Sequence, residues 1–332
     1  MRKIDEITLD LLKDKDWQNP KSFEEMGYIY FGPLVFNFFI WLKNELNGCD
    51  KVLFNSREGY FLNKIYDIFK NKFDLPESVY FKTSRKLSSI VSFKTSQDIY
   101  DSFSLHRYEG NLSDLLKNRF NIELEIKNNE LIDTNINLPN LEIYINSILE
   151  KSRETRNEYE KYINHVIGSS KKIVMVDSGY QGTTQFYIQK TYDLKFKGRY
   201  LIYKGNIPLE DVCGFYDYNT SNLKQNLIFF ESVFVDNVGS FIDIKNGKFI
   251  NESINHNKFD FNKNKNIIKG VEKFINDMLT NDIDLMNINY ELSNHIFNLM
   301  CSKDYVKNIK LFDNFYHDNF YVRTGTKKLY RI

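Results

Sequence analysis

The segment from Lys171 to Lys190 constrains the fold more than any other part of this 332-residue chain. Ile173 to Val176 is a short, continuous apolar run with β-branched residues, which is typical of a strand buried on both faces of a parallel sheet. Asp177 ends the run, and Gly179 and Gly182 permit backbone conformations that other residues avoid. The segment therefore predicts a buried strand, an acidic residue and a glycine turn.

The turn after this strand has the composition of a phosphate-binding loop. Thr183 and Thr184 follow the glycines, and Gln185 to Lys190 can continue as a helix. Converging backbone N–H groups, the positive end of a helix and hydroxyl groups together bind phosphate oxygens. An ordinary strand-to-helix turn of an α/β sheet has the same layout, so this segment alone leaves both interpretations open.

A second segment, Lys51 to Lys70, repeats the order of buried strand, polar glycine-containing turn and helix. Val52 to Asn55 reads as a buried strand, Ser56-Arg57-Glu58-Gly59 as a turn, and a helical pattern starts at Tyr60. Arg57 adds a fixed cation suited to bidentate phosphate binding. A surface arginine beside a capping serine is the alternative interpretation.

A third strand is predicted from Ser78 to Thr83, and it ends in Ser84-Arg85-Lys86. The two cations suit an anion, or they form a solvated basic turn. Residues 87–170 differ from their surroundings and predict a helical insertion before the strand that ends at Asp177. Its helices are expected at 97–104, 111–119 and 141–167, with an irregular piece or small hairpin at 120–140.

The rest of the chain completes an α/β pattern. We expect an N-terminal helical segment at 1–50 that packs on the core, an α/β core at 51–250 and a C-terminal helical region at 251–332. The further elements expected are helices at Ile4–Lys13 and Pro33–Leu46, strands at Arg199–Tyr203 and Val212–Tyr216, a hairpin at Phe241–Ile250, a polar loop at 251–266, and helices at Ile267–Leu279, Tyr290–Met300 and Tyr305–Phe315.

Composition excludes several classes of function. The formal net charge is +1, so no global field points to nucleic acid. The 3 cysteines and 5 histidines show no metal-ligand spacing, and an odd cysteine count argues against a disulfide framework. The charged start is no signal peptide, and the most apolar stretch, Tyr28 to Leu42, is shorter than the roughly 20 residues of a spanning helix. These features favour a cytoplasmic protein.

The two glycine loops are expected to meet, because the carboxyl ends of parallel strands lie at one edge of the sheet, where ligands bind. The loop at 178–184 would hold a single phosphate. The Ser56–Gly59 loop, helped by Arg85 and Lys86, would hold a more highly charged group. Asp177 would lie between them and accept hydrogen bonds from sugar hydroxyls. A ligand of that shape is 5-phosphoribosyl 1-pyrophosphate.

At this point two segments show a family resemblance. VMVDSGYQGTT resembles the signature loop of type I phosphoribosyltransferases, in which a strand ends in two acidic residues before a Thr/Gly-rich loop around the 5-phosphate. Asp177 matches the first acid, Ser178 replaces the second, and the loop is about one residue shorter than in those enzymes. LFNSREGYF is similar to their pyrophosphate loop, and Arg85-Lys86 falls where they often carry cations.

A second resemblance covers most of the chain. It is carried by GYIYFGPLVFNFFIWL, LFNSREGYFL, YFKTSRK, VDSGYQGTTQ and FFESVFVDNVGS. Together they resemble the C-terminal half of proteins labelled predicted haloacid-dehalogenase-type hydrolases in bacterial surface-polysaccharide gene sets. No D-x-D-x-T follows an early strand, so the chain is expected to lack the aspartyl-phosphate chemistry of that label.

The resemblance implies a glycan phosphoribosyltransferase with a type I phosphoribosyltransferase-like α/β fold. Such an enzyme transfers ribose 5-phosphate from phosphoribosyl pyrophosphate to a sugar hydroxyl of a growing glycan, and a separate partner phosphatase then removes the phosphate. Mg²⁺ is the expected cofactor, bridging the pyrophosphate and the ribose oxygens. A lipid-linked acceptor would bring the cytoplasmic protein to the inner membrane surface.

The resemblance also implies roles for particular residues. Asp177 is expected to bind ribose hydroxyls or the metal, and a carboxylate is expected to act as general base. The 5-phosphate residues are Ser178, Gly179, Tyr180, Gln181, Gly182, Thr183 and Thr184; the pyrophosphate residues are Ser56, Arg57, Glu58 and Gly59, assisted by Arg85 and Lys86; and the candidate bases are Glu58, Glu231 and Asp236.

Three other classes remain as alternatives. A phosphohydrolase needs a nucleophilic Asp with a second Asp two residues on, and neither loop supplies that pair. A sugar-nucleotide glycosyltransferase of another fold needs nucleotide contacts, for which the sequence shows no motif. A non-catalytic scaffold for polysaccharide assembly stays open because Ser178 and the short loop depart from the family pattern.

Overall fold

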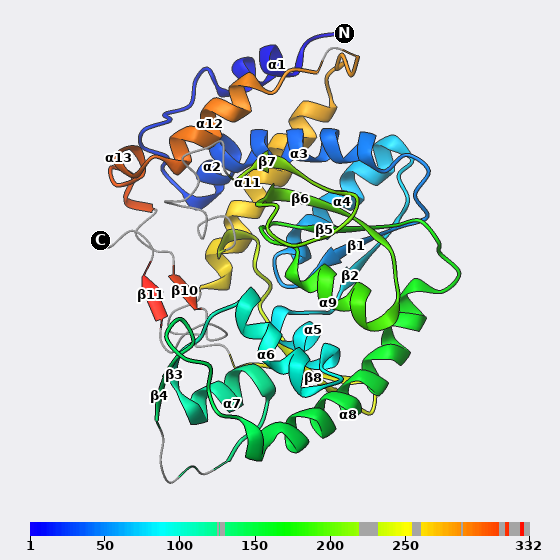
Figure 1. The fold of residues 1–332 in the computed structure, drawn as a ribbon. Coiled ribbons are helices and arrows are strands. Elements are labelled where there is room, and N and C mark those ends of the chain that lie inside the picture. The colour runs from blue at the N-terminus through cyan, green and yellow to red at the C-terminus, as the bar shows by residue number, and fades with distance from the viewer. Residues whose placement is uncertain are drawn as a thin grey trace.

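A five-stranded, all-parallel sheet forms the centre of the protein, with helices on both faces (Figure 1). The description rests on a computed structural model that covers residues 1–124, 126, 130–218, 232–253, 260–286 and 288–311, and the backbone of 316–318 and 326–328. The order along the sheet is β2-β1-β5-β6-β7. The predicted α/β class is confirmed, and the sheet is consistent with a type I phosphoribosyltransferase-like fold. The strands are β1 (Lys51–Asn55), β2 (Glu77–Phe81), β5 (Ile173–Asp177), β6 (Phe196–Tyr203) and β7 (Val212–Asp217).

One face of the sheet is covered by helices from the two ends of the chain. Val52 and Phe54 of β1, like Val174 and Val176 of β5, belong to a core cluster shared with these helices. The N-terminal helices predicted to pack on the core thus do so together with helices from beyond residue 260 (Figure 1). The elements on this side are α1 (Ile4–Leu12), α2 (Phe23–Met26), a π-helical turn (Gly27–Phe31), α3 (Gly32–Glu45), α4 (Gly59–Phe73), α11 (Phe261–Leu279), α12 (Glu291–Cys301) and α13 (Lys303–Val306).

The other face is covered by the middle of the chain. Because side chains alternate along a strand, Leu53 of β1 and Met175 of β5 point away from the first cluster and pack in a second one. The helices that complete this cluster are α5 (Arg85–Ser92), α8 (Glu142–Ile167) and α9 (Thr183–Tyr192). The remaining elements are α6 (Ser96–Leu105), α7 (Leu112–Phe120), and the antiparallel pairs β3 (Glu109–Asn111) with β4 (Leu131–Asp133), β8 (Phe241–Lys245) with β9 (Lys248–Asn251), and β10 (Tyr316–Asp318) with β11 (Thr326–Lys328).

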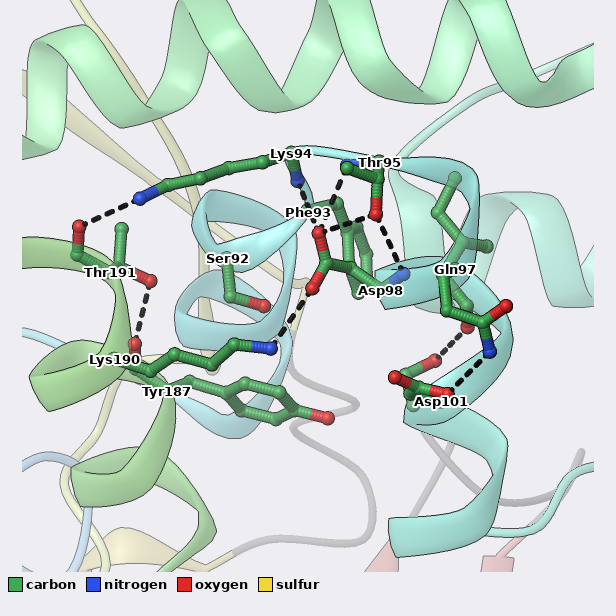
Figure 2. Close-up of polar contacts among 12 residues, drawn as sticks. Ser92, Phe93, Lys94, Thr95, Gln97, Asp98, Asp101, Tyr187, Lys190 and Thr191 are labelled. Atoms are coloured by element: carbon green, nitrogen blue, oxygen red, sulfur yellow. Dashed lines mark hydrogen bonds and ion pairs between the residues drawn. The ribbon is translucent and has the colours of Figure 1, made fainter.

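Residues 87–170 contain the three expected helices. The short strand β4 at Leu131–Asp133 pairs with β3, which precedes α7 at Leu112–Phe120, so the two strands do not form the hairpin considered for 120–140. The small core of this insertion includes Phe93, Leu116 and Ile148. A network at the start of α6 fastens the insertion to α9: Lys190 Nζ lies 2.9 Å from Asp98 Oδ1, and Lys94 Nζ donates to the Thr191 carbonyl at 3.3 Å (Figure 2). The insertion therefore holds the helix that follows the predicted phosphate loop.

Several boundaries differ from the sequence prediction, among them the start of β6, which lies at Phe196 rather than Arg199. The basic Arg85-Lys86 pair begins helix α5 rather than a turn, because the Ser84 hydroxyl accepts the Leu87 N–H and caps that helix. The loop predicted at 251–266 is cut short by α11, whose first N–H groups are capped by Asp260. In the described part of the predicted helix at 305–315, α13 already ends at Val306; residues 312–315 lie outside the described ranges.

The hairpin predicted at Phe241–Ile250 is confirmed. Asn246 and Gly247 both have positive φ angles, 50° and 72°, as a two-residue turn between twisted antiparallel strands requires. Within the described ranges, no helix is long and apolar enough to cross a lipid bilayer.

The N- and C-terminal helices meet at a very close backbone crossing. A Cβ atom at Gly270 of α11 would lie 1.9 Å from the Glu24 carbonyl oxygen, and one at Gly27 would lie 1.9 Å from the Ile267 carbonyl oxygen. Both neighbours are backbone atoms, so neither can swing aside. Glycine is required at these two positions because the helices touch there.

We expect the Gly270→Ala variant to lose about 1–3 kcal/mol of unfolding free energy through overpacking. Helix propensity alone would favour alanine by about 1 kcal/mol, so the sign of the change separates the two effects. The measurement is urea unfolding. Asn266→Ala, on an exposed position of the same helix, is the control and is expected within about 0.5 kcal/mol of wild type. A stabilised Gly270→Ala protein would contradict the close crossing.

Candidate active site

The strand order places a topological switch point between β1 and β5. From β1 the chain proceeds to β2 on one side, and from β5 it proceeds through β6 to β7 on the other. In open parallel sheets, ligands bind in the crevice outside the carboxyl ends of the two strands at such a point. The two predicted ligand loops directly follow these two strands, so the fold brings them side by side.

A hydrogen bond joins the two strand ends. Phe54 is paired with Val176 across the sheet, so the next residues, Asn55 and Asp177, lie opposite each other on the same face. Asn55 Nδ2 donates to Asp177 Oδ2 at 2.8 Å. Asp177, whose carboxylate is predicted to lie between the two loops, is thus hydrogen-bonded by a residue of β1, the strand that leads into the Ser56–Gly59 loop.

The carboxyl group of Asp177 has a pKa raised to about 7. Enclosure by the protein is the largest cause, although part of the residue stays accessible to solvent, and the Glu58 carboxylate adds like-charge repulsion. Hydrogen bonds from Asn55 and from the backbone N–H groups of Gly179 and Ser178 oppose the rise. Asp177 therefore exchanges a proton near neutral pH.

Asn55 carries an unsatisfied acceptor at the same point. Its side chain is 1% exposed, and its Oδ1 atom has no hydrogen-bond partner among the described residues. Asn55 was not a candidate at the sequence level, where it only ended an apolar run. A buried carbonyl oxygen without a partner costs about 1–3 kcal/mol.

In the Ser56–Gly59 loop, Ser56 and Gly59 fix the position of the backbone, and Arg57 and Glu58 have partly exposed side chains. The Ser56 hydroxyl accepts the Thr83 N–H at 3.0 Å and donates to the Thr83 carbonyl, so it ties the loop to the end of β2. Gly59 lets α4 approach β1, since a Cβ there would lie 2.8 Å from the Phe54 carbonyl carbon. The side chains of Arg57 and Glu58 are half-buried, and the Arg57 N–H donates to Glu58 Oε2 at 3.1 Å.

The loop at 178–184 continues along β6 before it turns into α9. The carbonyl oxygens of Ser178 and Tyr180 accept the N–H groups of Ile202 and Lys204. Gly182 has a φ of 76° and precedes the first residue of α9, so the predicted need for glycine is confirmed there. The prediction of an unusual backbone conformation is wrong for Gly179, because its φ angle is not positive. A Cβ atom at Gly179 would lie 3.2 Å from the Ile202 carbonyl oxygen.

Within this loop, Thr183 is buried and Gln181 and Thr184 are half-buried. The Thr183 hydroxyl lies 3.0 Å from His106 Nε2, at the end of α6. One further feature is common to both loops: the peptide bonds Ser56–Arg57 and Gly179–Tyr180 are cis.

His106 is a residue that sequence analysis missed. Burial and the nearby cations Arg85 and Arg119 lower its pKa to about 2, so its ring is neutral. Arg119 is itself buried and donates to the carbonyls of His106 and Arg107. No local sequence signal marks His106, because only the fold of the insertion brings it to the start of α9.

The two basic residues that follow β2 have different surroundings. Arg85 lies close enough to His106 to act on its pKa, which associates this cation with the 178–184 loop. Lys86 is buried and points into the insertion, where its Nζ donates to the Lys117 carbonyl at 2.9 Å and lies 3.8 Å from Glu252 Oε1. Burial lowers the pKa of Lys86 to about 8. The structure thus holds its ammonium group against α7.

The three candidate bases are placed differently. Glu58 lies close enough to Asp177 for its charge to raise the pKa of that carboxyl group. Asp236 lies beside the Ser56–Gly59 loop, because its N–H donates to the Arg57 carbonyl at 3.3 Å. Its Oδ2 accepts the Tyr80 hydroxyl of β2 at 3.0 Å. Glu231 lies outside the described residues.

Comparisons with known proteins do not place the chain in a family. No protein-family model matches it, and a search of curated proteins finds none that matches. Among the described residues, no group of three or more His, Cys, Asp or Glu side chains is arranged to hold a metal ion. Asp177 and Glu58 supply two neighbouring carboxylates, which suits a Mg²⁺ ion whose other ligands are phosphate oxygens and water.

We expect Asp177→Asn to be more stable relative to wild type at pH 8 than at pH 5 in the ligand-free protein. A folded pKa near 7, above the ordinary value of 3.8, means that the folded state binds more protons than the unfolded state between about pH 4 and 7. The stability of the wild type therefore falls as pH rises through this window, and the variant lacks that loss. Urea unfolding at several pH values measures the difference.

Asp50→Asn is the matched control at the opposite edge of the sheet. Backbone N–H groups of Lys172 and Lys171 lower the pKa of Asp50, so its contribution is lost only below about pH 4. Its difference from wild type is expected to stay constant between pH 5 and 8. Parallel stability curves for Asp177→Asn and wild type over the same range would show that Asp177 is not desolvated.

Proposed function

We propose that the protein is a phosphoribosyltransferase that transfers the 5-phosphoribosyl group from phosphoribosyl pyrophosphate to a sugar hydroxyl of a bacterial surface glycan. The observation that supports this most is the convergence of two glycine-containing loops at one switch point, with Asn55 and Asp177 hydrogen-bonded between them. A doubly phosphorylated sugar matches two such loops. A cytoplasmic site, a lipid-linked acceptor at the inner membrane surface and a partner phosphatase belong to the same proposal.

Each part of the donor has a matching group. The backbone from Gly179 to Thr184 and the start of α9 receive the 5-phosphate, with Arg85 and His106 on the insertion side. Arg57 receives the pyrophosphate, since its guanidinium can bind two phosphate oxygens at once. The ribose hydroxyls lie between the loops.

The crevice floor suits a ribose ring with its two hydroxyls. The carboxylate of Asp177 has two oxygens that can accept hydrogen bonds from the ribose hydroxyls, and Asn55 holds one of these oxygens in place. A bound Mg²⁺ ion, held by Asp177 with Glu58 nearby, would neutralise charge on the leaving pyrophosphate. Asp177 carries a negative charge where an oxocarbenium-like transition state develops positive charge, and Arg57 stabilises the departing group.

The competing phosphohydrolase lacks its second carboxylate. A nucleophilic Asp177 would need an acid two residues on, and that position is Gly179. The carboxylate that acts on the pKa of Asp177 is Glu58, which stands on another segment. The arrangement therefore fits binding of a sugar between two phosphates better than aspartyl-phosphate chemistry.

We expect the protein to bind phosphoribosyl pyrophosphate with Mg²⁺, and Arg57→Ala to weaken that binding by about 10- to 100-fold, as loss of a charge-assisted hydrogen bond implies. Isothermal titration calorimetry measures the affinity. Lys171→Ala, an exposed cation at the opposite edge of the sheet, is the matched control and is expected to bind as wild type does.

Two results would contradict the proposal. One is wild-type protein that does not bind phosphoribosyl pyrophosphate but does bind a nucleotide sugar such as UDP-glucose. The other is an Arg57→Ala protein with unchanged affinity, which would remove the Ser56–Gly59 loop from the pyrophosphate site.

A further inference from the structure

The two described candidate bases differ in what surrounds them. Glu58 lies beside Asp177 and raises its pKa, and its Oε2 accepts the Arg57 N–H at 3.1 Å. In the proposed complex this carboxylate is therefore on the donor side of the crevice, next to the ribose and the metal-binding carboxylate. A base for the acceptor must lie where a second substrate can reach it.

Asp236 occupies a different position, on a segment that passes over the Ser56–Gly59 loop. Its N–H donates to the Arg57 carbonyl, which fixes its backbone against the pyrophosphate loop. Its two carboxylate oxygens accept separate hydrogen bonds: Oδ2 from the Tyr80 hydroxyl at 3.0 Å, and Oδ1 from the Asn237 N–H at 2.6 Å. The residue remains partly exposed. It is thus a carboxylate that is held at both oxygens and keeps partial access to solvent.

The surroundings of Tyr80 keep its ring in place and its hydroxyl protonated, so that it donates to this carboxylate. It lies on β2, the strand next to β1, and its ring packs edge-on against Tyr60 with 5.5 Å between centroids. Burial, and then the Asp236 carboxylate, raise the pKa of Tyr80 far above its usual value, so the hydroxyl stays a donor at all working pH values. The other charged groups that act on Tyr80 are Glu58 and Arg57.

We infer that Asp236 is the general base that activates the acceptor hydroxyl and that Tyr80 is its positioning residue. This inference rests on the proposed function and deepens it, because it divides the crevice into a donor side at Asp177 and an acceptor side at Asp236. Tyr80 was not a candidate at the sequence level. The alternation of side chains along β2 gives no reason to single it out.

The transfer step balances without further reactants. The acceptor O–H proton moves to an oxygen of Asp236. The acceptor oxygen forms a bond to C1 of the ribose, while the bond from C1 to the pyrophosphate oxygen breaks and its electron pair leaves with pyrophosphate. Water can replace the sugar hydroxyl in this step, so slow hydrolysis of the donor reports on the same base.

The test compares Asp236→Asn and Tyr80→Phe in the full-length protein, with phosphoribosyl pyrophosphate and Mg²⁺ as donor and water as acceptor. Asn keeps one carbonyl oxygen, which can still accept the Tyr80 hydroxyl, and only the bond from the Asn237 N–H is lost, so the fold is expected to persist. We expect Asp236→Asn to bind the donor within about twofold of wild type and to release pyrophosphate about 10²- to 10⁴-fold more slowly.

Tyr80→Phe is expected to lower kcat about tenfold while leaving the KM for the donor unchanged. A purely structural role would instead lower donor binding and turnover together. Tyr66→Phe is the control: it removes a buried tyrosine hydrogen bond to Pro76 O, just before the same strand, and is expected to leave both kcat and the donor KM unchanged.

The possible outcomes distinguish a wrong assignment of the base from a wrong proposed function. An active wild type with an unimpaired Asp236→Asn variant would overturn the assignment of the base and leave the proposed function standing. A Tyr80→Phe variant with raised donor KM and normal kcat would make Tyr80 a donor-binding residue and overturn its positioning role. A wild type that neither binds the donor nor releases pyrophosphate would overturn both.

Discussion

A carboxylate withdrawn from water at a strand end is the constraint on which the site depends. Asp177 is held by Asn55 from the neighbouring strand and by two backbone N–H groups, yet enclosure and Glu58 together outweigh these bonds and raise its pKa to about 7. Burial of a charge is costly unless a partner compensates it. The parallel pairing of β1 with β5 fixes this arrangement, because the register sets Asn55 opposite Asp177.

Segments far apart in the sequence come together around the two loops that follow β1 and β5. The insertion contributes His106, which lies against the start of α9, and it is fastened to the other end of that helix through Asp98 and Lys190 (Figure 2). The segment after residue 232 contributes Asp236, which lies against the other loop. The helices of the two chain ends cover one face of the sheet (Figure 1), and α11 holds the segment before Asp236, because Asn264 Nδ2 donates to the Ser232 carbonyl at 2.8 Å.

The parts of the fold that follow from local pattern could be predicted, and the parts that depend on distant contacts could not. Buried strands at β1 and β5 follow from short apolar runs, and the Asn246-Gly247 turn follows from an Asn-Gly pair between two apolar segments. The closeness of the two loops follows from the rule that the carboxyl ends of parallel strands lie at the same edge of the sheet. His106 and Tyr80 could not be found this way, since their roles arise from contacts across 77 and 156 residues.

Arg85 and Lys86 show that distant contacts can give two adjacent residues different roles, which the sequence does not reveal. As a turn, the pair would point both cations toward one anion. As the first two residues of α5, they are turned about 100° apart around the helix axis, so one acts on His106 and the other reaches the Lys117 carbonyl. The Ser84 cap decides between these outcomes. One hydrogen bond at a helix end thus determines which of two neighbouring cations lies close to the 178–184 loop and which becomes part of the scaffold.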